Sequence, residues 1–170
     1  GRAARFRWPQ PATWLTLMLP VFAWAALTYP GYFELHSGFR PIFNVADLFG
    51  PRGDILGRYR KVHLPQYERW QVSLGSGFPA FQTELGWIGM LICYDQMWPE
   101  SATCCAMNGA QLICQPSAAS LPDYLMRTRA RDNQVHFLSS TYMNSMIVSP
   151  GAQILANACS EQDAVIWADV

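Results

Sequence analysis

Short apolar runs separated by turn residues occur along most of the chain, and they predict β-strands. Each run is of strand length and is bounded by Gly, Pro, Asn, Asp or Ser, which is typical of strands. The runs lie at residues 32–35, 43–49, 55–59, 88–92, 111–115, 137–142, 146–149, 154–158 and 165–168. Residues 51–54 predict a hairpin loop, because Pro and Gly stand there between two of the runs.

Two segments between these strands have helical features. Pro99 and Glu100 suit the first turn of a helix and the Asn-Gly pair after Met107 suits its end, so residues 100–107 are predicted to be helical. Residues 121–134 carry apolar side chains at helical spacing, with polar side chains on the other faces. Alternating strands and helices, flanked by a hairpin, predict a layered α/β fold with a mixed sheet.

The first 29 residues differ in character from the rest of the chain. Three arginines precede a strongly apolar stretch, residues 12–29, which contains Pro20. Signal peptides and membrane helices share this order of a basic flank and an apolar run, but the run is marginal in length and is interrupted by proline. We therefore expect a helix at 14–19 and a buried strand at 22–28 rather than a membrane span. Residues 30–170 are interpreted as one domain.

Composition narrows the possible partners. The 170-residue chain has a formal net charge of +0, so its charge indicates neither nucleic acid nor an anionic membrane as a partner. Hydrophobic residues make up 51% of the chain and charged residues only 14%, so we expect a partner subunit or a part of the chain outside this sequence to cover apolar surface. The chain begins at Gly1 and stops directly after the predicted strand 165–168, and we expect both ends to be cuts in a longer protein.

The five cysteines form no recognisable framework. They show neither a CxxC pair nor a spacing of Cys and His that is typical of zinc ligands. Free thiols are typical of a reducing compartment, so we expect a cytoplasmic protein. The sequence contains no glycine-rich phosphate-binding loop, and no cofactor is expected.

Cys93 is the candidate nucleophile. It lies between the predicted strand 88–92 and the predicted helix 100–107, where a rigid strand end and nearby helix amides favour a reactive thiolate. The alternative is a buried small apolar residue, which is the commoner role of such a cysteine. Lys61, His63 and Glu68 form a second polar concentration in an irregular stretch that is either a solvated loop or a functional one.

Two motifs resemble those of the nitrilase superfamily, the carbon–nitrogen hydrolases. Residues 57–64 (Gly-Arg-Tyr-Arg-Lys-Val-His-Leu) resemble its lysine motif, and residues 92–100 (Ile-Cys-Tyr-Asp-Gln-Met-Trp-Pro-Glu) resemble its nucleophile motif. Cys93 follows Lys61 by 32 positions, as is typical of amidases in the superfamily. The resemblance implies a four-layer αββα sandwich, incomplete at both termini of this chain, and assembly into homo-oligomers.

The resemblance also implies a role for each residue of the site. Cys93 would attack the carbonyl carbon of a small amide or carbamoyl compound and form a thioester. Lys61 would stabilise the developing oxyanion, together with the backbone N–H of Tyr94. Glu68, seven positions after Lys61, would correspond to a second glutamate of the family and would orient the base, Lys61 or the substrate. His63 would orient the loop, and a Cys–His dyad is the rival chemistry.

The chain departs from the family pattern at the general base. The only acidic residues before Lys61 are Glu34, Asp47 and Asp54, and none of them stands in the context of the base motif. Because a positioned base contributes about 10²–10⁴-fold in rate, we expect impaired activity. Two alternatives remain open: a non-catalytic binding or assembly domain with this fold, and a membrane-linked acyltransferase relative, which the basic and apolar N-terminus would suit.

The sequence indicates the substrate class less clearly. Residues 93–95, Cys-Tyr-Asp, resemble amidases and carbamoylases, whereas nitrilases usually show Cys-Trp-Glu, so an amide is expected rather than a nitrile. Gln96 and Met97 stand where carbamoylases often carry arginines that bind a carboxylate. Three arginines of the second predicted helix could supply such a clamp, but they are interpreted as exposed charges: Arg127, Arg129 and Arg131.

Overall fold

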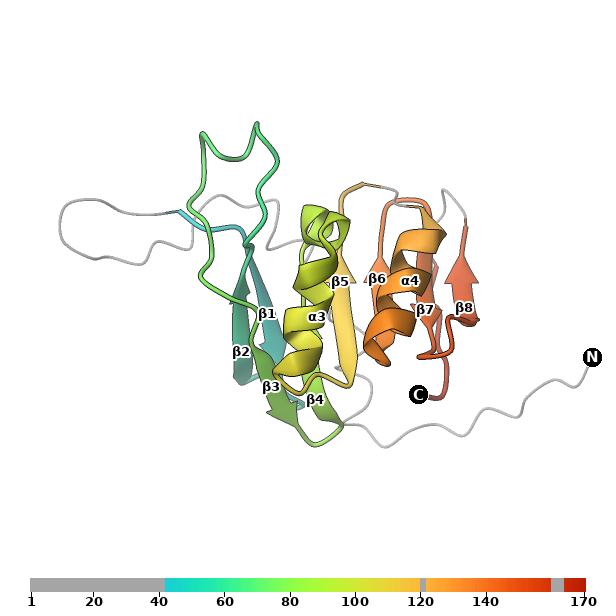
Figure 1. Ribbon diagram of the computed structural model, residues 1–170. Coiled ribbons are helices and arrows are strands. Elements are labelled where there is room, and N and C mark those ends of the chain that lie inside the picture. The colour runs from blue at the N-terminus through green and yellow to red at the C-terminus, as the bar shows by residue number, and fades with distance from the viewer. Residues whose placement is uncertain (1–41, 120–121, 160–163) are drawn as a thin grey trace, which may run out of the picture.

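The strands form two sheets (Figure 1), in a computed structural model that describes residues 42–119, 122–159 and 164–170. Strands β1 (Val45–Phe49) and β2 (Ile55–Arg60) make a two-stranded antiparallel sheet. The loop between them contains Gly53 at a φ of 82°, a left-handed conformation that glycine adopts without steric penalty. The hairpin predicted at residues 51–54 is therefore confirmed.

The second sheet has six strands in the order β3-β4-β5-β6-β7-β8. Their bounds are β3 (Ala80–Thr83), β4 (Gly86–Met90), β5 (Leu112–Pro116), β6 (His136–Ser140), β7 (Ser145–Val148) and β8 (Ile154–Ala158). β4, β5 and β6 run parallel to one another, and the remaining pairs are antiparallel, so the sheet is mixed as predicted. The carboxyl ends of the three parallel strands meet at one edge, which is where ligands bind in open α/β sheets.

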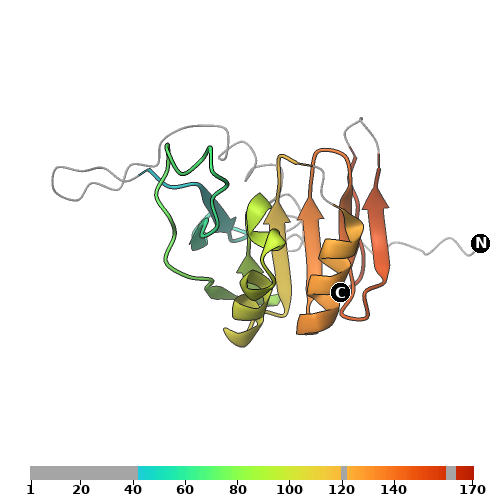
Figure 2. The same ribbon diagram turned by 45° about the horizontal axis from the view of Figure 1, so that its top comes forward.

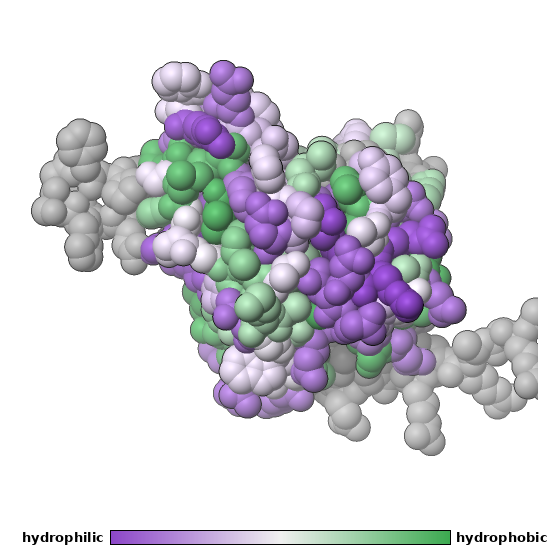
Figure 3. Space-filling view, viewed as in Figure 1, coloured by the Kyte–Doolittle hydropathy of each residue, from purple (hydrophilic) through white to green (hydrophobic). Residues whose placement is uncertain are grey.

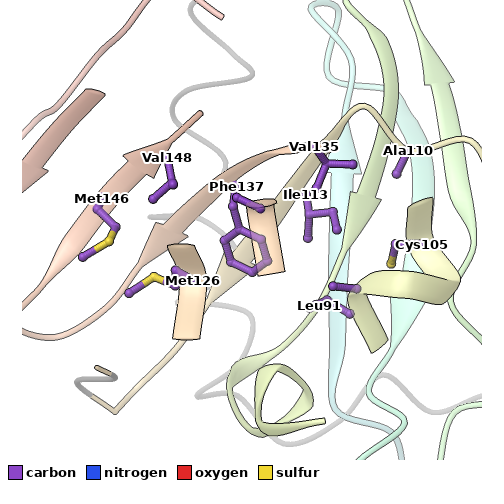
Figure 4. Close-up of a cluster of buried hydrophobic side chains, with 11 residues drawn as sticks. Leu91, Cys105, Ala110, Ile113, Met126, Val135, Phe137, Met146 and Val148 are labelled. Carbon is purple, nitrogen blue, oxygen red and sulfur yellow. The ribbon is translucent and has the colours of Figure 1, made fainter. Parts of the chain in front are cut away.

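Two α-helices cover one face of the six-stranded sheet. Helix α3 (Pro99–Met107) lies in front of β4 and beside β5 in Figure 1, and helix α4 (Asp123–Asn133) lies in front of β6 and β7; the turned view in Figure 2 shows the same arrangement. Buried apolar side chains fill the space between the helices and the sheet and form the helix-side core (Figure 4): Leu91, Ala102, Cys105, Ala110, Ile113, Met126, Ala130, Val135, Phe137, Met146 and Val148. This core fixes both helices on the sheet.

A second apolar cluster, the inter-sheet core, joins the two sheets. Its fully buried members come from both sides: Ala46, Leu48, Tyr59, Ile88, Met90 and Ile92. Gly57 of β2 lies against Phe81 of β3 so closely that a Cβ at position 57 would overlap the phenyl ring. The described residues thus form three successive layers, which are the helices, the six-stranded sheet and the two-stranded sheet, out of the four layers predicted.

Most predicted elements are confirmed to within two residues at each end, but two features differ. The prediction of a strand at 165–168 is wrong: residues 164–170 contain no strand, and Val165 and Trp167 are 73% and 58% exposed. The apolar composition of this segment therefore does not correspond to a buried strand. β3 is not predicted from the sequence, because its four residues follow Pro79 and show no alternation, and only pairing with β4 makes them a strand. The elements predicted at 14–19, 22–28 and 32–35 lie outside the described residues.

The surface differs in polarity from one side to the other. In Figure 3 hydrophilic side chains gather over α4, whereas a hydrophobic patch lies beside the long loop that follows β2. Within the described ranges, no helix has the length and apolar character needed to cross a bilayer. The apolar stretch at 12–29 lies outside those ranges.

Candidate active site

Cys93 lies where the chain leaves β4 and enters the short 3₁₀ helix η1 (Cys93–Met97). Its φ angle is 46°, in the left-handed region that residues other than glycine rarely adopt. The Gln115 side chain holds this turn, because its Nε2 donates a hydrogen bond of 2.8 Å to the carbonyl oxygen of Cys93. A conformation of this kind costs about 1–3 kcal/mol and is found mostly at functional sites, where the surrounding structure enforces it.

Tyr94 follows Cys93 in the first turn of η1. Backbone N–H groups in the first turn of a helix have no partner within that helix. The Tyr94 ring packs edge to face against Trp98, with the ring centroids 6.4 Å apart. The backbone N–H of Tyr94, in the first turn of η1, is thus not used in a hydrogen bond within that helix. An oxyanion donor must be free in this way.

Lys61 comes directly after β2 and is buried, with only 1% of its surface exposed. Its Nζ lies 2.8 and 2.7 Å from the two carboxylate oxygens of Glu68. Glu68 is held in turn by the loop, where its amide donates a hydrogen bond to the carbonyl oxygen of Pro65. Because a buried cation needs a partner and hydrogen bonds, the Glu68 carboxylate allows the structure to keep an ammonium group at this place.

Asp95 connects the turn at Cys93 to the chain around Lys61. Its Oδ1 accepts a hydrogen bond of 2.8 Å from the backbone N–H of His63. Its Oδ2 accepts hydrogen bonds from the Tyr59 hydroxyl at 2.7 Å and from the backbone N–H of Ile92 at 2.9 Å. Burial raises the pKa of this carboxyl, and the hydrogen bonds from the two amides and the hydroxyl oppose the rise.

The His63 imidazole is held by rings and by hydrogen bonds. It stacks between Phe78 and Trp98, with centroid distances of 5.7 and 5.4 Å. Its Nδ1 lies 3.1 Å from the Ser101 hydroxyl and 3.3 Å from Asp95 Oδ1. Among the hydrogen bonds and ion pairs of the described residues, none joins this imidazole to a cysteine thiol. These contacts favour the loop-orienting role of His63 over the Cys–His dyad.

The structure brings Lys61 and Glu68 into direct contact and holds Cys93 on a separate turn. Partial burial raises the pKa of Tyr67, and the charges of Glu68 and Cys93 raise it further, so the phenol is within electrostatic reach of both groups. In the part of the chain that the structure describes, no hydrogen bond or ion pair joins the Cys93 thiol to Lys61 or Glu68. The position of Cys93 relative to Lys61 and Glu68 therefore depends on the strands and turns that carry these residues.

Two cavities of the molecule lie apart from these residues. One, of about 360 Å³, is lined by the β1–β2 hairpin and the turn between β3 and β4. The other, of about 400 Å³, is lined by Arg58, Arg60 and residues 76–79. Neither lining includes Cys93, Lys61 or Glu68. No cluster of His, Cys, Asp and Glu among the described residues is suited to bind a metal ion.

The arginines of α4 differ from one another. Arg127 and Arg131 are exposed, as predicted, but the prediction is wrong for Arg129, which is only 6% exposed. The Arg129 Nε donates a hydrogen bond of 3.2 Å to the carbonyl oxygen of Gln96, and its Nη2 donates one of 3.4 Å to that of Met97. Arg129 therefore supports the backbone of η1.

The acidic residues before Lys61 have structural partners of their own. Asp47 lies on β1 and accepts two hydrogen bonds from the Arg58 guanidinium of β2, at 2.7 and 2.9 Å. Asp54 is exposed in the hairpin loop, and its backbone carbonyl accepts a hydrogen bond from Gly50. Both belong to the hairpin, as interpreted from the sequence, and Glu34 lies outside the described residues.

Three residues that hold the site were not identified from the sequence as parts of it: Tyr59, Asp95 and Gln115. Tyr59 shares a strand face with Lys61 because it lies two residues earlier, so the period-two rule could have found it. Asp95 belongs to the nucleophile motif, but its role depends on partners distant in sequence. Gln115 ends a parallel strand at the edge where ligands bind, which is a weak signal.

The sequence pattern of the family described as carbon-nitrogen hydrolase matches residues 14–170 of this chain. The human omega-amidase NIT2 is 31% identical over 155 residues, which cover 76% of this chain and 56% of that protein. The nitrilase of Pyrococcus abyssi is 32% identical over 142 residues, with 76% of this chain and 54% of that protein covered. This chain therefore spans about half the length of the curated relatives that it matches.

A solved structure supports the same family relationship. The crystal structure of Saccharomyces cerevisiae Nit3, a member of branch 10 of the nitrilase superfamily, superposes with a TM-score of 0.67 at 31% identity. The superposition covers 74% of this chain and 52% of that one. It confirms the nitrilase-type α/β fold that the two sequence motifs predicted.

Proposed function

Because the chain belongs to the carbon–nitrogen hydrolase family, we propose that the protein hydrolyses the carbon–nitrogen bond of a small amide through a thioester on Cys93. One observation carries this proposal: the buried Lys61 ammonium is fixed by Glu68 next to a chain segment that is hydrogen-bonded to the Cys93 turn. A fixed cation and a thiol at the end of a parallel strand are the two parts that amide attack requires.

In the first step the Cys93 sulfur forms a bond to the amide carbon. The carbonyl oxygen becomes an oxyanion, which the Lys61 ammonium and the Tyr94 backbone N–H stabilise. The intermediate then breaks its carbon–nitrogen bond, and ammonia or an amine leaves with the proton that the thiol gave up. Glu68, whose carboxylate lies 2.7 Å from Lys61 Nζ, keeps the ammonium in place.

In the second step water attacks the thioester, releases the carboxylic acid and returns the thiol. A base must accept the proton of this water, but the Asp47 carboxylate is hydrogen-bonded to Arg58 and the Asp54 side chain is exposed in the hairpin loop. Because a positioned base contributes about 10²–10⁴-fold, we expect this chain to hydrolyse the thioester slowly.

The substrate class follows from the relatives and from the motif. The matched relatives are called an omega-amidase and a nitrilase. The Tyr94-Asp95 pair after the nucleophile supports an amide or carbamoyl substrate over a nitrile.

Assembly and compartment belong to the same proposal. A homo-oligomer would cover exposed apolar side chains such as Trp70, which is 84% exposed, and Met107, which is 82% exposed. The five cysteines carry free thiols, which supports a reducing compartment such as the cytoplasm.

The test is ammonia release from small amides by the full chain, with mass spectrometry to detect an acyl group on Cys93. We expect Cys93→Ala to abolish the adduct and to lower ammonia release by about 10⁴-fold or more, since loss of a nucleophile disables the whole catalytic unit. Cys159→Ala is the matched control, because the Cys159 side chain is exposed and its thiol donates a hydrogen bond to Asn144. Cys159 also lies far from Lys61 in sequence.

Ammonia release that persists in Cys93→Ala contradicts the proposal. A wild-type chain that forms no adduct and releases no ammonia from amides or carbamoyl compounds also contradicts it, and favours the non-catalytic binding domain.

A further inference from the structure

Asp95 bridges two segments of chain that meet at the candidate site. Two of its partners, Tyr59 and His63, flank Lys61 at alternate positions of the chain. The third, Ile92, is the residue that precedes the nucleophile. One buried carboxylate is therefore bonded to the chain on both sides of the lysine and to the start of the nucleophile turn.

The hydrogen-bond partners of Asp95 are donors. The backbone amides of His63 and Ile92 can only donate, and they face different carboxylate oxygens. The Tyr59 hydroxyl shares the second oxygen with Ile92. An asparagine in this place would turn its NH₂ group toward one of the two backbone N–H groups in either orientation. The hydrogen bonds to Asp95 thus require the two acceptor oxygens of a carboxylate, and an amide of the same shape does not replace it.

Asp95 is fully buried, with 0% of its surface exposed, so it does not face solvent or substrate. What its bonds fix is the placement of two other groups. Lys61 Nζ is bonded to Glu68, and the Cys93 carbonyl is bonded to Gln115. Lys61 and Cys93 lie on different segments, and the hydrogen bonds of the Asp95 carboxylate join these two segments.

We propose that Asp95 is a positioning residue that sets the separation between the Cys93 thiol and the Lys61 ammonium. The inference rests on the proposed function, because it takes these two groups as the reacting thiol and its cation. Asp95 touches no reacting atom and acts through the two chain segments.

A positional effect and a charge effect have opposite signs here. Removal of a nearby negative charge by itself favours a thiolate, because like charges repel. Displacement of the Lys61 ammonium away from the thiol disfavours the thiolate. The pH profile of thiol alkylation therefore separates positioning from electrostatics, and a change in stability alone does not move it.

The test measures iodoacetamide alkylation of Cys93 in the 170-residue chain, with peptide mass spectrometry to distinguish it from the other cysteines. We expect Asp95→Asn to move the midpoint of the pH profile upward by about one unit. This corresponds to about tenfold slower alkylation at neutral pH, because only the thiolate reacts. A midpoint that stays in place or moves downward overturns the proposal.

Two further variants keep the test decisive. Asp47→Asn removes another buried carboxylate, which accepts two hydrogen bonds from Arg58, and we expect it to leave the midpoint unchanged. Tyr59→Phe keeps the ring and removes the hydrogen bond to Asp95, together with a longer one of 3.3 Å that the hydroxyl accepts from the Val62 amide. We expect it to move the midpoint upward by a smaller amount, and it replaces Asp95→Asn as the deciding variant if the latter does not fold.

Lys61→Ala distinguishes this inference from the proposed function. If Lys61→Ala raises the midpoint and Asp95→Asn does not, positioning by Asp95 is overturned while the role of Lys61 stands. If neither variant raises it, the role of Lys61 in the proposed function fails, and the positioning role fails with it.

Discussion

Two buried regions of the molecule, the helix-side core and a polar region at the candidate site, contain different kinds of side chain. The helix-side core consists of apolar residues, among them Phe137 and Ile113, which are completely buried. The region where β2 meets the Cys93 turn holds Lys61, Asp95 and Gln115, each no more than 1% exposed. Apolar burial stabilises a fold by about 25 cal/mol per Å², whereas polar burial is offset by desolvation. The first region thus supplies stability, and the second fixes polar groups in place.

Phe137→Ala should give the largest effect on stability. It leaves a cavity in the helix-side core, and we expect a loss of about 3–5 kcal/mol in the free energy of unfolding, measured by urea denaturation. Tyr124→Ala on α4, where the side chain is 61% exposed, should cost far less. The folded fraction of Phe137→Ala should alkylate Cys93 with the wild-type pH profile. A changed profile would mean that the two regions are not separate.

Gln115→Met should have a smaller effect on stability and a direct effect on the site. It removes the hydrogen bond to the Cys93 carbonyl and the one from Ser139. An unpaired buried carbonyl costs about 1–3 kcal/mol, and the strained turn loses its support. Gln111→Met is the matched control, because the Gln111 side chain is bonded to the Trp87 amide at an exposed position. Equal losses of stability in the two variants would show that burial of the hydrogen-bond partner does not affect the cost of leaving it unpaired.

Cys105→Ala should change how stability depends on pH. Burial raises the pKa of the Cys105 thiol to about 12 from 9.0, so the folded chain holds this proton after the unfolded chain has lost it. Its contribution to stability is complete below about pH 9 and decreases as the pH rises toward 12. We expect wild type to lose about 1 kcal/mol per pH unit relative to Cys105→Ala in this window, measured by urea denaturation. Parallel pH curves would contradict the burial of this thiol.

Sequence patterns predicted the strands and helices better than the polar contacts. β8 (Ile154–Ala158) was predicted at its observed bounds, because an apolar run and its turns are local properties. The buried face of α4 carries Met126, Arg129 and Ala130, at the spacing that the helical period requires. Arg129 was interpreted as exposed because of its charge, although its position places it on that face.

The polar region could be predicted only in part. The spacing of two motifs led to the prediction of Cys93 and Lys61 as nucleophile and cation, roles that stay predictions, and the structure shows a contact between Lys61 and Glu68. The partners of Asp95 could not be predicted, because its hydrogen bonds reach back to Tyr59 and His63 across the sheet. A pattern along one chain contains no information on which distant donors meet.

The Arg129 side chain has a mechanical consequence for the site. Its planar guanidinium is bonded to two successive carbonyls of η1, so this short helix cannot rotate or slide against α4 without breaking both hydrogen bonds.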